Sequence, residues 1–168
     1  LEPGDENNRT LSDIYEDAAF AEGLLLNGYI HLPTNGFSFN DVATDDAVSN
    51  DVTSNYRAMA TGQWSAINNP VNKWGLYTAI QYLNIILSEA DKVEWATTGQ
   101  YVKEMFNDRT KGEAYGLRAI MMYYILQAHG GPAADGNFLG VLNFVNPWTS
   151  SSDFNIPRVS YKACVDQI

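Results

Sequence analysis

The residues of this chain that could do chemistry are concentrated between residues 34 and 70, where acidic, amide and aromatic side chains alternate with small polar ones. Asp45 and Asp46 are adjacent carboxylates. Glycoside hydrolysis uses two carboxyl groups on either side of the scissile bond, one of them with a raised pKa. Adjacent residues seldom converge on one substrate atom, so the pattern favours a structural role for this pair, in a turn or a helix cap.

A calcium site is a second chemistry that this acidic segment could support. Its carboxylates come from Asp41, Asp45, Asp46 and Asp51. The spacing lacks the glycine and the terminal glutamate of an EF-hand loop. The chain also has one cysteine and two histidines, too few for a cysteine-based zinc site or a histidine-rich one. We therefore expect no metal site.

Sugar binding is a third chemistry, and the long loops contain the side chains for it. Flat aromatic rings cover the apolar C–H face of a pyranose, while amides and carboxylates exchange hydrogen bonds with its hydroxyl groups. For each ring the competing interpretation is partial burial as a loop anchor. The candidate ligand-binding residues are Phe37, Phe39, Tyr56, Trp64 and Trp148, with Asn50, Asp51, Asn55 and Asn68 as polar companions.

The overall composition limits the class of protein. The 168 residues have the length of one domain, and 45% of them are hydrophobic, which is enough for a packed core. A formal net charge of −10 repels phosphate backbones, so nucleic acid is not an expected partner. The chain contains no Ser/His/Asp set, phosphate-binding glycine loop or nucleotide motif. We expect neither an enzyme nor a cofactor.

Hydrophobic periodicity predicts that helices position these loops. Ser12 is a suitable cap for a first helix that ends near Asn27-Gly28, and Pro70 suits the first turn of a second. A further turn is expected near Thr98–Phe106, and Ser160 caps a helix that starts at Tyr161. The predicted helices are Leu11–Leu26, Val52–Met59, Pro70–Asp91, Lys111–His129 and the segment from Tyr161 onward.

The helix predicted at Lys111–His129 has the clearest boundaries. Thr110 and Glu113 form a Thr-x-x-Glu capping box at its start. Gly130–Pro132 predicts its end, because glycine readily adopts a left-handed closing conformation and proline cannot continue the helix. Both faces of the helix are apolar, so it should pack against neighbours on two sides.

Several residues near these helices have a structural interpretation that we prefer to a catalytic one. Glu113 and Arg118 could be an acid with a charged helper, but their spacing is poor for a direct pair on a helix. Arg118 should instead fix helix packing by pairing with a carboxylate or loop carbonyls, with Asp45 or Asp46 as the candidate carboxylate.

Four other residues are assigned to packing or capping. The periodicity of the second helix places Trp74 and Tyr77 in the core. His129 lies at a helix C-terminus, where a cation interacts well with the helix dipole. Cys164 is on the apolar side of the last helix, as a small core residue would be.

Together these elements predict a mainly α fold of helical hairpins joined by long irregular loops. The starts of the second, third and fourth helices lie about 40 and 50 residues apart, which allows tetratricopeptide-like hairpins but does not match a strict 34-residue repeat. The last helix has only two turns and is marginal unless packed or continued. We therefore expect residues 1–168 to be part of a larger α-rich domain.

Four sequence features occur in an order that resembles the N-terminal half of the SusD/RagB family, the glycan-binding lipoproteins of bacterial outer membranes. Each is common alone, whereas their order and spacing over most of the chain are specific. They are Ala43–Ala47 (ATDDA), Trp74–Asn84 (WGLYTAIQYLN), Gly112–Ala114 with Arg118-Ala119 and Gly130–Pro132, and Ile156–Tyr161 (IPRVSY).

The resemblance implies a cell-surface protein that captures an oligosaccharide or polysaccharide and passes it to a TonB-dependent, SusC-like transporter. It further implies that residues 1–168 are the N-terminal part of one SusD-like domain, which a C-terminal remainder completes. Family members are tethered to the outer membrane through a lipidated N-terminal cysteine, which this chain lacks. Starch-binding members have an aromatic arc where this chain has Val48–Asp51, so a different glycan is expected.

Two other functions stay open at this point. A helical-repeat adaptor that binds proteins or peptides would share the hairpins, although such repeats normally have short loops. A glycoside hydrolase would use Asp45 and Asp46 as its catalytic carboxylates.

Overall fold

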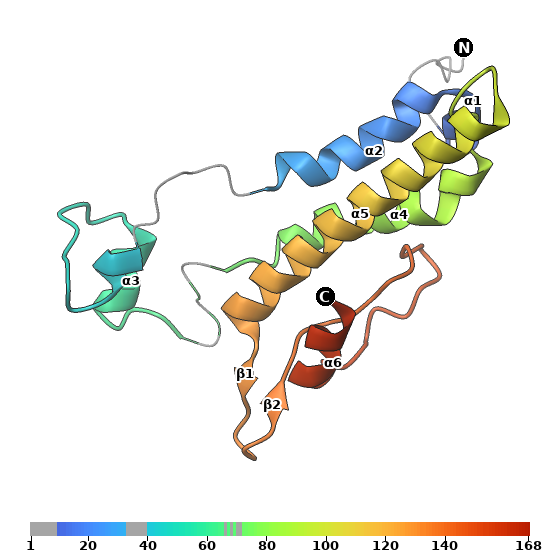
Figure 1. Ribbon diagram of the computed structural model, residues 1–168. Coiled ribbons are helices and arrows are strands. Elements are labelled where there is room, and N and C mark those ends of the chain that lie inside the picture. Colours follow the sequence, from blue (N-terminus) through green and yellow to red (C-terminus); the bar gives the residue numbers. More distant parts are fainter. Residues whose placement is uncertain (1–9, 33–39, 66, 68, 70–71) are drawn as a thin grey trace, which may run out of the picture.

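Three long helices form the body of the protein, which we describe from a computed structural model (Figure 1). They are α2 (Ala18–Ile30), α4 (Leu76–Glu89) and α5 (Gln100–His129), and α4 packs against both of the others. The structure describes residues 10–32, 40–65, 67, 69 and 72–168. The described chain is mainly helical, which confirms the predicted fold class.

The first predicted helix is divided in two. A single turn, α1 (Asp13–Glu16), precedes α2, and Asp17 between them has an extended backbone. The Asp17 carboxylate accepts a hydrogen bond from the Phe20 backbone N–H at 3.1 Å and so caps α2. Asp17, and not Ser12, provides the cap, because Ser12 makes no side-chain capping hydrogen bond.

Gly28 lies inside α2, although the sequence predicted that the helix ends there. A Cβ at this position would lie 2.9 Å from one methyl carbon of Leu83 and 3.0 Å from one of Leu117. The missing side chain therefore lets α2 approach α4 and α5 closely. Gly28 serves packing here, and the helix continues to Ile30.

The predicted capping box at Thr110 is wrong, because α5 already begins at Gln100. Thr110 is buried within the helix. Glu113 accepts hydrogen bonds from Arg109 Nε and Tyr29 Oη, each at 2.7 Å. These partners satisfy the carboxylate and join α2 to α5. The turn predicted near Thr98–Phe106 belongs to the first part of the same long helix.

The C-terminal end of α5 is where the sequence predicted it, at His129. The mechanism differs, since Gly130 has φ −77° and is extended, not left-handed. The chain enters strand β1 (Gly131–Pro132), which pairs with β2 (Phe138–Leu139) in antiparallel register.

The second predicted helix is shorter than expected. Among the described residues it starts at Leu76, after turn hydrogen bonds from Leu76 to Lys73 and from Tyr77 to Trp74. The 3-10 helix η2 (Ala90–Lys92) follows its end. The predicted start at Pro70 lies outside the described residues.

The smaller elements flank this body. The 3-10 helix η1 (Asn40–Ala43) packs against α3 (Asn55–Ala60), which is close to the predicted Val52–Met59, and the two lie apart from the three long helices (Figure 1). At the other end of the chain, α6 (Tyr161–Gln167) begins after Ser160, whose hydroxyl caps it as predicted.

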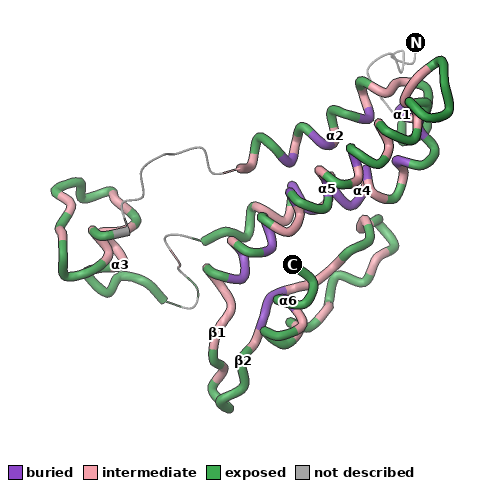
Figure 2. The backbone as a smooth tube through the Cα atoms, viewed as in Figure 1, coloured by how far each residue is buried: buried purple, intermediate pink, exposed green. Residues whose placement is uncertain are grey.

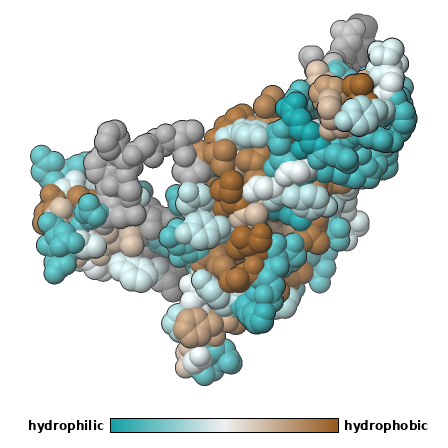
Figure 3. All heavy atoms as spheres, viewed as in Figure 1, coloured by the Kyte–Doolittle hydropathy of each residue, from teal (hydrophilic) through white to brown (hydrophobic). Residues whose placement is uncertain are grey.

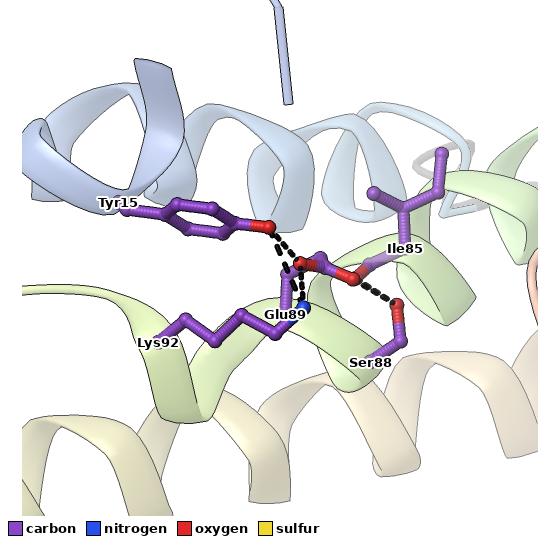
Figure 4. A network of polar contacts seen from close by, with 5 residues as sticks. All are labelled: Tyr15, Ile85, Ser88, Glu89 and Lys92. Carbon is purple, nitrogen blue, oxygen red and sulfur yellow. Dashed lines mark hydrogen bonds and ion pairs between the residues drawn. The ribbon is translucent and has the colours of Figure 1, made fainter. Parts of the chain in front are cut away.

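The hydrophobic core lies where the long helices face one another (Figure 2). One cluster joins α1, α2, α4 and α5, and a second joins α4 and α5 to Val141 and Cys164. Cys164 is fully buried, which confirms its predicted packing role. Near the first cluster, Tyr15 donates a hydrogen bond to Glu89, which also pairs with Lys92 at 2.8 Å (Figure 4).

One face of α5 is left exposed, and hydrophobic residues gather over the middle of the molecule (Figure 3). Tyr115, Ile120 and Tyr123 of α5 are exposed, and so is Ile168 at the end of the chain. The predicted partners on two sides of α5 are present, since α2 and α4 pack along it and α6 and Val141 pack against its C-terminal half, but part of its surface stays exposed. No helix in the described residues has both the length and the apolar character needed to cross a membrane.

Candidate functional site

A cleft of about 740 Å³ opens between the C-terminal end of α5 and the segment that precedes α4. Its floor and walls come from parts of the chain that are far apart in sequence. The lining residues are Trp64, Ser65, Ile67, Asn69, Asn72, Trp74, Ala128, His129, Gly130, Gly131, Pro132, Ala133, Leu139 and Arg158.

Trp74 forms one aromatic surface of this cleft. Its ring stacks on the imidazole of His129, with centroids 3.7 Å apart and planes 13° apart, and it is 44% exposed. The prediction that Trp74 belongs to the core is therefore wrong. Because α4 begins only at Leu76, Trp74 precedes the helix and is not on its buried face. Tyr77, one turn further along, is half-buried and donates to the Leu142 carbonyl.

His129 positions the ring of Trp74 by stacking on it. Its Nε2 accepts a hydrogen bond from the backbone N–H of Lys73 at 2.9 Å, which requires the unprotonated nitrogen. Burial, reinforced by the positive charge of Arg158, lowers the pKa of His129. The residue therefore acts as a neutral acceptor, and the predicted role as a cation at the helix end is wrong.

Arg158 also lines the cleft and is anchored by two backbone carbonyls. Its Nε donates to the Gly140 carbonyl at 2.7 Å, and its Nη2 donates to the His129 carbonyl at 2.6 Å. The side chain thus ties the segment before α6 to the end of α5. Sequence reasoning did not select Arg158 as a site residue, although the Ile156–Tyr161 motif contains it.

Trp64 supplies the second indole. It is 57% exposed, and no aromatic ring of the described residues stacks on it. Ile67 beside it is 99% exposed. Asn69 and Asn72, which lie between the two tryptophans in the sequence, also line the cleft, and Asn72 Nδ2 donates to the Asn69 carbonyl at 3.3 Å.

Of the predicted ligand-binding residues that the structure describes, Trp64 alone lines the cleft. Asn50, Asp51, Asn55 and Tyr56 belong to the η1 and α3 part of the chain. Asp51 accepts hydrogen bonds from the backbone and hydroxyl of Thr53, which lower its pKa, so its carboxylate holds a turn. Phe37, Phe39 and Asn68 lie outside the described residues.

Trp148 anchors a loop, which was the alternative to ligand binding for each loop aromatic in the sequence analysis. Its ring stacks on Phe144 at 4.2 Å and meets Phe154 edge-on at 5.1 Å. Gln81 binds both its backbone N–H and its carbonyl at 2.9 Å. The indole therefore holds the loop onto α4 and lies outside the cleft.

The sequence analysis named Asp45 or Asp46 as the candidate carboxylate partner of Arg118, and Arg118 pairs with neither. Its Nη1 donates to Asn84 Oδ1 at 2.8 Å and to the Val145 carbonyl at 3.3 Å. The predicted packing role is thus carried by a buried amide and a loop carbonyl, with no carboxylate within ion-pair distance among the described residues.

Asp45 and Asp46 are both exposed and remote from the cleft residues in the chain. Asp46 is held by its own turn, where its backbone N–H donates to the Thr44 hydroxyl at 3.2 Å. In the described residues, no three His, Cys, Asp or Glu side chains gather as a metal site would need, and Asp41, Asp45, Asp46 and Asp51 form no such group.

The side chains of the cleft are of kinds that can contact a ligand. Two exposed indoles can stack on flat or apolar ligand faces, and the amides can exchange hydrogen bonds with hydroxyl groups. Among its described lining residues, one guanidinium is the only permanently charged group, and none is a carboxylate or a thiol. The arrangement suits recognition of a polar ligand that has apolar faces.

No protein-family model, curated protein or solved structure matches this chain. The resemblance to SusD/RagB proteins therefore stays a prediction that rests on the quoted sequence features.

Proposed function

We propose that this protein binds a glycan in the cleft between Trp64 and Trp74. The observation that carries the proposal is the pair of exposed indoles on one cleft, 57% and 44% accessible, which Asn69 and Asn72 also line. Solvent-exposed tryptophans carry a large apolar area, and pyranose C–H faces are a suitable partner for them. The amides supply the hydrogen bonds that a sugar's hydroxyl groups need.

Affinity would come from an aromatic surface, the ring of Trp74, that is already fixed in position before the ligand binds. His129 stacks under Trp74 and is itself fixed by Lys73 and Arg158. A ligand that stacks on Trp74 therefore has little side-chain motion to arrest, which reduces the entropic cost of binding. Trp64, on which no ring of the described residues stacks, would supply a second aromatic surface for the ligand.

The sequence resemblance extends this proposal to a biological role. The protein would act at the outer-membrane surface as the capture component of a nutrient-uptake complex, and would deliver its oligosaccharide or polysaccharide to a TonB-dependent, SusC-like transporter. No catalytic step is proposed. The apolar face of α5, with Ile120 and Tyr123 exposed, leaves room for the expected C-terminal part of the same protein.

Glycan binding is tested directly with an array of plant, microbial and host polysaccharides, followed by calorimetry on the ligands that bind. We expect at least one glycan to bind, and expect its binding to weaken in Trp64→Ala and Trp74→Ala variants. Absence of binding to every glycan on the array would remove the proposal.

The exposed face of α5 favours a second candidate, a helical adaptor that binds proteins. Tyr115, Tyr123 and Ile168 form an apolar surface beside Arg118, and aromatic and arginine side chains are enriched at protein interfaces. This candidate predicts peptide capture that Tyr123→Ala weakens and Trp64→Ala does not. The glycan array separates the two functions.

A further inference from the structure

The charge of the cleft differs from that of the whole chain. The protein has twenty acidic and ten basic residues. Despite this excess of acid, none of the described residues that line the cleft is Asp or Glu, whereas Arg158 is among them. A neutral ligand would not require the exclusion of carboxylates, but an anionic ligand would, since like charges in a cleft oppose binding.

Arg158 is held so that part of its guanidinium remains available. Its Nε and Nη2 are engaged by the carbonyls of Gly140 and His129, and its Nη1 makes no hydrogen bond within the described chain. Two backbone hydrogen bonds fix the plane of the group, so an oxygen ligand meets a donor in a defined position. A hydrogen bond from such a cation to a carboxylate is about twice as strong as one between neutral groups.

The other titratable groups around the cleft do not compete for this role. His129 is neutral, because its Nε2 accepts the Lys73 backbone N–H and its pKa is lowered. Lys73 is exposed, contributes its backbone N–H to His129, and is not among the residues that line the cleft. Arg158, on the segment before α6, is therefore the one permanently charged cation among the described residues that line the cleft.

We propose that the glycan taken by this cleft is acidic and carries uronate carboxylates, one of which binds Arg158 while the neighbouring ring stacks on Trp74. This inference deepens the proposed function and rests on it. Pockets of about 300–1,000 Å³ hold drug-sized molecules, so the cleft of about 740 Å³ fits roughly two or three sugar units. The site thereby selects sugars by charge as well as by ring shape.

The test compares acidic oligosaccharides with their own carboxyl-reduced forms on the unaltered protein. The panel consists of di- and trisaccharides that contain galacturonate, glucuronate, mannuronate or guluronate, each with its reduced counterpart, and calorimetry gives the Kd. We expect at least one acidic form to bind about tenfold more tightly than its reduced form. Raising the salt concentration should reduce this difference, since salt screens the ionic contact.

Three outcomes overturn the inference in distinguishable ways. Equal binding of acidic and reduced sugars ends the uronate assignment and leaves glycan binding in place. If sulfated sugars bind and no uronate-containing sugar does, the anionic group that the cleft recognises is not a carboxylate. Failure of every sugar to bind removes the proposed function as well.

Protein variants locate the carboxylate contact. Arg158→Gln should abolish the preference for the acidic form, while Lys162→Gln, which removes an exposed cation bound to Asp166 outside the cleft, should preserve it. Circular dichroism checks that each variant is folded. If Arg158→Gln does not fold, the comparison of acidic and reduced sugars on the unaltered protein still decides the inference. A preference that persists in folded Arg158→Gln would contradict it.

Discussion

The imidazole of His129 stacks on the indole of Trp74 with ring centroids 3.7 Å apart. The contact joins the last residue of α5 to the segment before α4, and the Lys73 backbone N–H donates to His129 Nε2 at 2.9 Å beside it. A ring that would otherwise move freely is thereby presented as a fixed surface. The candidate binding cleft depends on this relationship.

Removing either indole should weaken glycan binding. Trp64→Ala and Trp74→Ala are each expected to raise the Kd of the tightest-binding oligosaccharide by about tenfold, because a stacked aromatic contributes on the order of 1.4 kcal/mol. Tyr123→Ala is the matched control, since Tyr123 is an exposed aromatic that does not line the cleft. Calorimetry measures the effect, and an equal loss in the Tyr123 variant would argue against the cleft.

Stability should depend on pH through His129. The pKa of His129 is lowered in the folded protein by burial and by Arg158, so the unfolded chain binds more protons as the pH falls below about 6.5. The free energy of unfolding should then fall over the pH interval below about 6.5, by less than ~1 kcal/mol, because solvent screens this partly buried group.

Urea unfolding at a series of pH values checks the effect of His129. The control is His129→Gln, whose amide can still accept the Lys73 N–H but does not titrate. Its unfolding free energy should change less over this interval than that of the unaltered protein. Identical pH profiles for the two proteins would show that His129 is not the group responsible.

Gly28 and Gly23 provide a matched pair within α2. A Cβ at Gly28 would lie 2.9 Å from Leu83 and 3.0 Å from Leu117, whereas nothing lies within 4 Å of one at Gly23. Gly28→Ala should therefore lower the free energy of unfolding by about 1–3 kcal/mol through overpacking. Gly23→Ala should raise it by roughly 0.5–1 kcal/mol, because alanine favours the helix. Thermal or urea unfolding of both variants tests this, and equal effects would contradict the close packing of α2.

Asn84 should be the most sensitive polar residue of the core. It is 1% exposed, accepts from Arg118, and donates to the carbonyls of Phe144 at 3.2 Å and Asn146 at 3.4 Å. Asn84→Ala leaves these partners unsatisfied and should cost about 1–3 kcal/mol. Gln127→Ala, on the exposed side of α5, should change stability by less than about 0.5 kcal/mol.

A double-mutant cycle with Arg118→Ala then measures the coupling across α4 and α5. We expect about 0.5–1 kcal/mol, since Arg118 is only half-buried and part of its charge is solvated. Additive effects of the two substitutions would mean that the hydrogen bond contributes nothing to stability.

The sequence predicts elements best where the signal is local. Ser160 caps α6 through its own hydroxyl, and the chain leaves the helix after His129 as glycine and proline indicate. The mainly helical class also follows from periodicity, because the spacing of apolar residues determines which face a helix buries.

Features that depend on tertiary contacts were not predicted. The Thr110 and Glu113 pattern has the form of a capping box, yet Tyr29 and Arg109 bind the glutamate and the helix runs through it. Gly28 has the composition of a helix end, but its role is set by Leu83 and Leu117 on other helices. No local pattern contains such information.

The candidate cleft was predicted in part for the same reason. Trp64 was selected because an exposed loop aromatic is a local property. Trp74, His129 and Arg158 meet only when the end of α5, the segment before α4 and the segment before α6 come together. The sequence assigned Trp74 to the core, because periodicity cannot tell where a helix starts when its first turn is irregular.

The four tryptophans allow the most direct test of glycan binding at this cleft. Trp64 and Trp74 line the cleft, whereas Trp95 donates its indole N–H to the Ala90 carbonyl at 2.8 Å and Trp148 is stacked on Phe144. Each indole N–H gives its own NMR signal, assigned by single Trp→Phe substitutions, and is followed while the tightest-binding oligosaccharide is added. We predict that the signals of Trp64 and Trp74 shift in a saturable way and those of Trp95 and Trp148 stay in place. Saturable binding with the first two signals unmoved would contradict the account.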